Sequence, residues 1–260
     1  AFEGVFSGAQ LVIGNLEGAI TEHRVPRKAY VPGRSYTFRF PPGTGRLLKE
    51  ANFHVISVAN NHAYDYGTIG FADTQKNLAE AGVLSTGWKG SSVVVPVGPL
   101  KVAVLTLAHY PIFNNVLDIE AAARQVAELK AANDVVVLSY QLGAEGDAAA
   151  RLPPGPETFL SESRGDARAF ARRMAQAGAS FLVGHGPHVV RAAECVEGDV
   201  PALHSVGNFV SAGGLSAQRL SAVAGVAEGL FSATGQWRGV RVHPVAFTAA
   251  KMPVPDPAGK

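Results

Sequence analysis

Apolar residues in this chain fall mostly in short runs, and each run ends at polar residues, glycine or proline. Such runs are typical of buried strands, and a run without polar alternation indicates a strand covered on both faces. The run within Asp134–Ser139 is the clearest case, because four aliphatic residues follow one another there. Strands are predicted in this way over residues 10–14, 53–58, 134–139, 180–183 and 202–206.

Between these strands the apolar positions recur with the spacing of an α-helix. In residues 67–81, Phe71, Thr74, Leu78 and Ala81 share one face, and Gly82 closes the helix. Further elements are predicted as helices over 44–51, 118–132 and 165–177, and as strands over 93–97, 101–107, 229–233 and 239–247. Polar, glycine- and proline-rich composition predicts loops over 21–42, with an extended segment at 36–40, and over 143–163.

Strands that alternate with helices predict an α/β fold, and ligand sites in such folds lie beyond the carboxyl ends of the strands. Several clusters of polar residues follow directly after predicted strands. They are Asn15–Glu17, Asn60–His62, Gln141–Glu145, His185–His188 and Asn208. We therefore expect the chemistry of the protein to be gathered from these clusters.

Composition limits the classes of function. The chain has 260 residues, of which 47% are apolar and 17% charged, so a single large domain over residues 1–260 with a sizeable core is predicted. A net charge of +2 is too small to indicate a nucleic-acid partner. No apolar run approaches the roughly 18 residues of a membrane-spanning helix, and residue 1 does not open a signal-peptide pattern. Cys195 is the single cysteine, which excludes an internal disulfide and is compatible with the cytoplasm or with export.

The first two polar clusters carry groups that suit more than one role. Glu17, between two glycines after a strand, can be a metal ligand, a general base or a residue that caps a turn. Asn61 and His62 offer an amide oxygen and an imidazole, which can bind a divalent ion or orient a phosphate or carboxylate.

The segment Gly184–His188 is more specific. His185 and His188 lie three positions apart on a loop that glycine and proline constrain, so both imidazoles can converge on one point. Neutral imidazoles suit Zn, Fe or Mn, and a histidine near its free pKa also serves as a general acid or base.

Taken together, these segments resemble the CapA/PgsA family of bacterial proteins, which is associated with poly-γ-glutamate capsule synthesis. The similar stretches are Leu11–Thr21, Phe38–Tyr66, Asp134–Glu145 and Ala175–Asn208, which include NLEG, ANNHxxDYG and GHxPHV elements in that order. The resemblance implies a calcineurin-like metallophosphoesterase fold, an αββα sandwich. It also implies a site for divalent metal, Mn, Zn or Fe, with Asn61, His62, His185 and His188 as the candidate ligands and Glu17 as an acidic candidate.

The chain departs from the family pattern at two places. Relatives open with a strand that ends in a Gly-Asp element; this sequence begins at Ala1, after that point, so this element is either missing or lies upstream of Ala1. Relatives commonly carry a histidine where this chain has Gln141. An amide oxygen is a weaker ligand for Zn, Fe or Mn than an imidazole. We therefore expect a weakened two-metal site, or a protein that works without metal.

Three functions remain open. The first is a CapA-type, metal-dependent hydrolase or amide-processing enzyme. The second is a metal-independent acid–base catalyst of a lyase, dehydration or cyclisation step. The third is a non-catalytic accessory protein for capsule polymer. The expected catalytic residues are His185, His188, Glu17 and His62, and the expected substrate-binding residues are Asn15, Asn60, Gln141, Glu145, Asn208 and Tyr66.

The expected partner is an anionic polymer or a small biosynthetic molecule. A basic loop could meet an anionic partner, although a solvated surface is the ordinary explanation of such charges; it carries Arg24, Arg27, Lys28, Arg34 and Arg39. The resemblance implies a cell-surface or membrane-associated protein, whereas the absence of a signal or spanning segment is also compatible with the cytoplasm.

Overall fold

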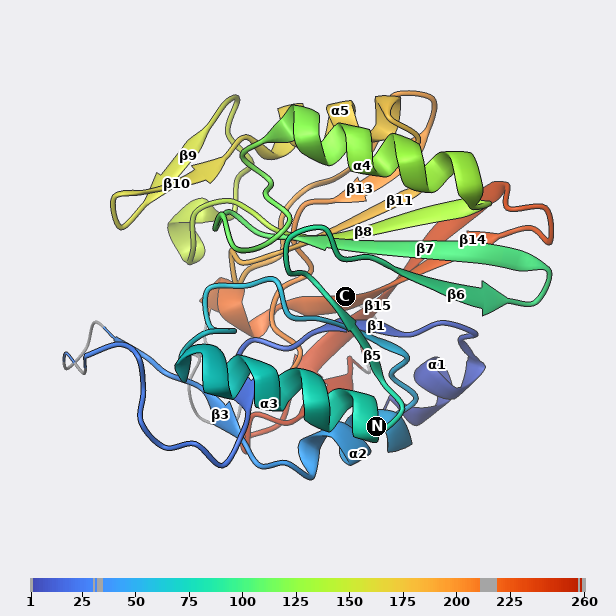
Figure 1. Cartoon of the computed structure of the whole chain (residues 1–260). Coiled ribbons are helices and arrows are strands. Elements are labelled where there is room, and N and C mark those ends of the chain that lie inside the picture. Colours follow the sequence, from blue (N-terminus) through green and yellow to red (C-terminus); the bar gives the residue numbers. More distant parts are fainter. Residues whose placement is uncertain (1, 30, 32–34, 211–218, 257, 259–260) are drawn as a thin grey trace.

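The computed structural model describes residues 2–29, 31, 35–210, 219–256 and 258. Figure 1 shows helices on the two outer sides of the molecule and β-structure between them. The largest sheet has the strand order β12-β13-β11-β8-β7-β6. Its strands are β6 (Val93–Val97), β7 (Leu100–Leu107), β8 (Val135–Gln141), β11 (Phe181–His185), β12 (Ala193–Val196) and β13 (Val200–Leu203).

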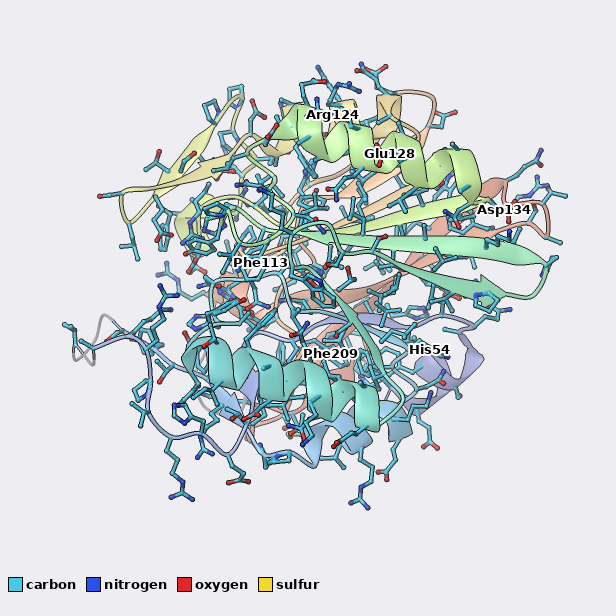
Figure 2. The ribbon with its side chains drawn as sticks, viewed as in Figure 1. His54, Phe113, Arg124, Glu128, Asp134 and Phe209 are labelled. Carbon is cyan, nitrogen blue, oxygen red and sulfur yellow. The ribbon has the colours of Figure 1, made fainter. Side chains whose placement is uncertain are left out.

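Two helices cover the outer face of this sheet, α4 (Ile119–Ala132) and α5 (Ala167–Gln176). Each begins at an aspartate whose carboxylate accepts a backbone N–H, Asp118 from Ala121 and Asp166 from Ala169. The apolar sides of the helices pack on Leu105, Leu138 and other buried residues of the sheet. Arg124 and Glu128 occupy the exposed side of α4 (Figure 2). The amphipathic pattern of each helix therefore places it on the sheet.

The second layer of β-structure faces the inner side of the six-stranded sheet. It contains the parallel strands β1 (Ile13–Asn15), β4 (Val55–Ser57) and β5 (Leu84–Thr86), in the order β1-β4-β5. It also contains the antiparallel strands β14 (Ala224–Phe231), β15 (Trp237–Phe247) and β16 (Pro253–Pro255). Helices α2 (Thr44–Glu50) and α3 (Gly67–Glu80) cover the outer side of β1-β4-β5 (Figure 1).

Smaller elements complete the fold. Helix α1 (Glu3–Gly8) packs Phe6 against Phe209, which Figure 2 labels. Strands β2 (Ala19–Ile20) and β3 (Arg39–Phe40) pair in parallel, and β9 (Glu157–Phe159) and β10 (Glu162–Gly165) form a hairpin. The short helices are η1 (Asp147–Ala149) and η2 (Arg219–Ala222).

Side-chain alternation along β8 explains why both faces of this strand are apolar. Val136 and Leu138 pack under the outer helices, whereas Val135 and Val137 join the apolar layer between the two sheets. Because successive side chains of a strand point to opposite faces, Gln141 falls on the inner side together with Val135 and Val137. The last residue of β8 therefore faces the second sheet.

The predicted αββα arrangement and most predicted elements are confirmed, and three differences have physical reasons. The segment 143–163 was predicted as a loop but contains η1 and β9 and leads into β10, because buried ion pairs rather than apolar runs hold this region. Strands β2, β5 and β16 and helix α1 were not predicted, since each is too short for a periodic pattern. The strand predicted over 202–206 ends at Leu203. In the part of the chain that the structure describes, no helix is long and apolar enough to span a membrane.

Candidate functional site

The predicted polar clusters meet at the carboxyl ends of the parallel strands of both sheets. In the six-stranded sheet, Gln141 at the end of β8 is the direct neighbour of His185 at the end of β11. In the second sheet, β1 and β4 run parallel and lead into the loops of Glu17 and Asn61. Gln141 bridges the two sheets, because its amide nitrogen contacts oxygens of both Glu17 and Asn61.

Asn60 ties the two loops of the second sheet together. Its amide nitrogen donates to Asn15 Oδ1 at 3.0 Å and to the carbonyl of Leu16 at 2.9 Å. Its Oδ1 accepts the backbone N–H of His62 at 3.1 Å, and the residue is only 1% exposed. These bonds connect the loops of Glu17 and His62. That Asn15 and Asn60 bind substrate stays a prediction.

His62 forms a closed group with three partners, which we call the His62 cluster: His62, Asp65, Lys28 and Phe38. Its Nδ1 lies 2.7 Å from Asp65 Oδ2, and the ring of Phe38 meets the imidazole edge-on with centroids 4.5 Å apart. The Asp65 carboxylate is fully buried, lies 3.0 Å from Lys28 Nζ and accepts the backbone N–H of Phe38 at 2.8 Å. Asp65 orients the imidazole, a role the sequence analysis did not assign although the spacing of three from His62 was a usable signal.

His188 forms the more open group, which we call the His188 cluster: His188, Glu17, Glu145 and Asn208. Asn208 donates from Nδ2 to the carbonyl of His188 at 3.2 Å, so its Oδ1 must be the atom 2.9 Å from His188 Nδ1. Nδ1 therefore carries the proton of the neutral ring and Nε2 carries the lone pair. Nε2 lies 3.8 Å from Glu17 Oε1 and 4.0 Å from Glu145 Oε2.

The backbone of His188 is strained. Its φ is +59°, in the left-handed region that a side chain with a Cβ seldom adopts. Such conformations cost on the order of 1–3 kcal/mol and persist where the surrounding structure enforces them, often at functional sites. The two hydrogen bonds to Asn208 hold His188 in this conformation, with Nε2 aimed at the two carboxylates.

Glu145 is held by a buried arginine. Arg164 Nη1 donates to Glu145 Oε1 at 2.8 Å, and Nη2 donates to Glu162 Oε2 at 3.3 Å. The Arg164 side chain is 4% exposed, and its guanidinium lies 5.2 Å from the centre of the Phe159 ring. Arg164 was not singled out from the sequence, because a lone arginine between an expected loop and an expected helix carries no distinguishing signal.

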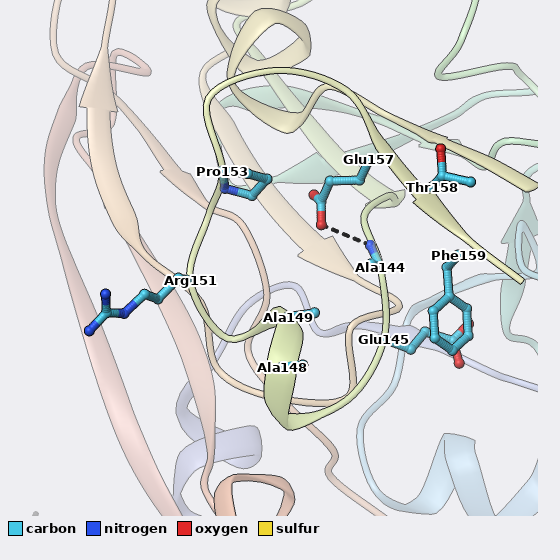
Figure 3. Close-up of a pocket in the computed structure, with 9 residues that line it drawn as sticks. All are labelled: Ala144, Glu145, Ala148, Ala149, Arg151, Pro153, Glu157, Thr158 and Phe159. Carbon is cyan, nitrogen blue, oxygen red and sulfur yellow. Dashed lines mark hydrogen bonds between the residues drawn. The ribbon is translucent and has the colours of Figure 1, made fainter.

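A surface pocket adjoins this cluster. It has a volume of about 380 Å³. Its lining combines Glu145 and Arg151 with small and apolar residues before β9 and with the β9 residues Glu157–Phe159 (Figure 3). Across the pocket, Glu157 accepts the backbone N–H of Ala144 at 3.0 Å and pairs with Arg191, which keeps the wall in place. The pocket therefore gives Glu145 an open side.

His185 and Tyr66 contribute in different ways. Burial, and secondarily the charge of the neighbouring His188, lowers the pKa of His185 to about 4, so this imidazole is neutral at neutral pH. The side chain of His185 has no hydrogen-bond partner among the described residues. Tyr66 lies at the start of α3, where its carbonyl accepts the N–H of Gly70. Within the described part of the chain its hydroxyl bonds none of these groups, so its predicted role in substrate binding stays a prediction.

The predicted metal ligands do not fit a metal centre as they are arranged. Across residues 2–29, 31, 35–210, 219–256 and 258, no three His, Cys, Asp or Glu side chains are placed to share a metal ion. Asn61 Oδ1 and Glu17 Oε1 both face the amide nitrogen of Gln141. His62 Nδ1 contacts Asp65, which leaves Nε2 as the nitrogen of this ring that could hold a metal. A divalent ion at these residues stays a prediction from the fold, and no chemical step is derived through it.

The two packed sheets with outer helices, and the loops at their strand ends, define a calcineurin-like phosphoesterase fold. A phosphatase from Mycoplasma pneumoniae superposes with a TM-score of 0.56 at 14% identity, covering 100% of this chain and 91% of that one. A 5'-nucleotidase precursor from Thermus thermophilus gives a TM-score of 0.50 at 17% identity, covering 81% of this chain and 43% of that one. These likenesses establish the fold.

Sequence similarity assigns the chain to a family within this fold. The model of the bacterial capsule synthesis protein family PGA_cap matches residues 1–213, and the chain belongs to this family. The PGA biosynthesis protein CapA of Bacillus subtilis is 28% identical over 85% of this chain and 58% of its own length. The capsule biosynthesis protein CapA of Bacillus anthracis is 29% identical over 64% of this chain and 42% of its own length. The chain thus spans about half the length of these relatives.

Proposed function

We propose that this chain is an acid–base enzyme of capsule biosynthesis whose proton transfers run through His188 and need no metal ion. The observation that carries the proposal is the position of His188 Nε2, which bears the lone pair and lies within 4.0 Å of both Glu17 and Glu145. A proton taken up at Nε2 creates an imidazolium that two carboxylates stabilise. Asn208 holds the ring in the tautomer that this step requires.

The reaction that best suits this arrangement is the elimination of water from a carboxylate-bearing substrate. His188 Nε2 removes a proton from a C–H group, and the same imidazolium returns that proton to the departing hydroxyl group. One C–H bond and one C–O bond break, a C=C bond forms, and water leaves, so no oxidant or other reactant is needed. The residue acts first as base and then as acid.

The basic loop supports an anionic substrate. Lys28 contacts Asp65 and donates to the carbonyl of Asn61 at 3.3 Å, so the loop lies directly on the His62 cluster. Arg24 and Arg27 in the same loop are exposed and form no ion pair with described residues. Exposed cations beside a site favour the approach of anions. Arg34 lies outside the described residues.

The proposal is tested by incubating the purified chain with malate and with 3-hydroxyglutarate in EDTA and measuring loss of water by mass spectrometry. Both probes are carboxylates with a hydroxyl group on the carbon next to a C–H group, as the proposed step requires. We expect product with the wild type and none with His188→Ala. His243→Ala is the matched control. It removes a histidine of β15 that pairs with Glu228 of β14, and it should retain product formation.

A metal-dependent hydrolase is the competing function, and the phosphatase and nucleotidase titles of the fold neighbours motivate it. Hydrolysis of bis(p-nitrophenyl) phosphate with added Mn²⁺, abolished by EDTA, would favour this competitor. If the chain forms product only when Mn²⁺ is present, the metal-independent proposal is wrong.

A further inference from the structure

Gln141 occupies the centre of the site and uses both ends of its amide. The residue is 2% exposed, and its Oε1 accepts the backbone N–H of Asn61 at 3.0 Å. Its Nε2 donates to Asn61 Oδ1 at 2.7 Å and lies 3.4 Å from Glu17 Oε1. The side chain therefore links the two sheets at the position where the predicted metal ligands gather.

The orientation of this amide follows from its partners. A backbone N–H can only donate, so the atom of Gln141 that faces the N–H of Asn61 must be the oxygen. The NH₂ group then faces the oxygens of Asn61 and Glu17. A divalent cation at this site would be coordinated by these oxygens. They already face the N–H hydrogens of Gln141, which carry partial positive charge.

The packing around Gln141 prevents the side chain from swinging aside. Gly186, between the two histidines, has φ +108°, and a Cβ at this position would lie 2.9 Å from Gln141 Cγ. The Gly186 backbone thus closes over the stem of Gln141. Rotating the amide would also leave the half-buried N–H of Asn61 without its partner.

We propose that Gln141 excludes divalent cations from the space among Glu17, Asn61, His185 and His188. Gln141 is then the residue that makes the site independent of metal. The inference rests on the proposed function and adds the residue responsible. It predicts that replacing the NH₂ donor by a group with a lone pair creates metal affinity. Gln141→His supplies a neutral imidazole ligand, and Gln141→Glu supplies a carboxylate of the same shape.

The experiment is titration of the purified chain with MnCl₂ by calorimetry, which requires no substrate. We expect Gln141→His and Gln141→Glu each to bind one Mn²⁺ at least about 10-fold more tightly than the wild type. Gln176→His is the matched control, because Gln176 is the exposed last residue of α5 and adds an imidazole away from the site. This control should behave as the wild type does.

Circular dichroism confirms that each variant is folded, and Gln141→Glu keeps the test decisive if Gln141→His does not fold. The inference is overturned if folded variants bind Mn²⁺ no more tightly than the wild type. It is also overturned if the wild type is isolated with near-stoichiometric metal that Gln141→Glu does not increase. Failure of the proposed function shows itself separately, as lack of product from the wild type in EDTA.

Discussion

The His62 cluster and the His188 cluster are two histidine sites on either side of the same glutamine, yet they are built in opposite ways. Asp65 and Phe38 surround His62, and the Asp65 carboxylate accepts from several partners. His188 is held on one side by Asn208, while its Nε2 faces two carboxylates beyond hydrogen-bond distance. We therefore expect the closed cluster to contribute stability, whereas the proposed function uses the lone pair of His188 in the open one.

The largest effect is expected from a substitution that disrupts the His188 cluster. His188→Ala should lower the rate of water elimination by about 10²–10⁴-fold, the usual contribution of a general acid–base residue. Product formation measured by mass spectrometry checks the rate, and urea unfolding should show that the variant remains folded. Equal rates in His188→Ala and the wild type would remove His188 from the chemistry.

The next largest effect is expected from a substitution that disrupts the His62 cluster. Asp65→Ala leaves Lys28, the Nδ1 of His62 and the N–H of Phe38 without their shared acceptor. Buried donors that lose their acceptor cost about 1–3 kcal/mol, and the Lys28 side chain, which is 43% exposed, adds little. Urea unfolding should show this loss, whereas Glu50→Ala, at an exposed i,i+4 pair, should change stability by less than about 1 kcal/mol. An unchanged midpoint for Asp65→Ala would mean that this cluster does not contribute stability.

A smaller effect on the free energy of unfolding is expected from relieving the backbone strain at His188. At φ +59° an alanine is strained as histidine is, whereas glycine is not. His188→Gly should therefore exceed His188→Ala in free energy of unfolding by about 1 kcal/mol. The comparison of these two variants by urea unfolding cancels the loss of the imidazole. A lower stability for His188→Gly would show that the chain is not strained here.

A last effect depends on pH and concerns the buried His109, whose Nε2 lies 3.6 Å from Glu162, a carboxylate that Arg164 also contacts. Burial, and next the nearby Arg164, lowers the pKa of His109 from 6.5 to about 4. The folded state then binds fewer protons than the unfolded state between these pH values, so stability falls as the pH is lowered from about 6.5 towards 4. His109→Gln should lose this part of the pH dependence. Unfolding free energies at pH 7 and pH 5 test it, and equal pH dependence in both proteins would contradict it.

The sequence was most informative where local patterns decide structure. The apolar run of β8 and the helical spacing of α3 predicted elements that the structure confirms within a few residues. Polar residues after strand ends located the site, because parallel strands of a sheet end at one edge. Hydrogen bonds between distant residues were not predictable: the bond between Gln141 and Asn61 joins residues 80 positions apart.

By itself, the sequence determined which residues follow the strands, and so which chemical groups reach the edge of the sheets. Only the tertiary structure decided their roles. Asn60 became a bridge between loops, Asp65 an orienting group, and Arg164 the partner of Glu145. The physical reason is that the role of a polar group depends on which of its donors and acceptors are already used, and those partners come from the other sheet and from remote loops.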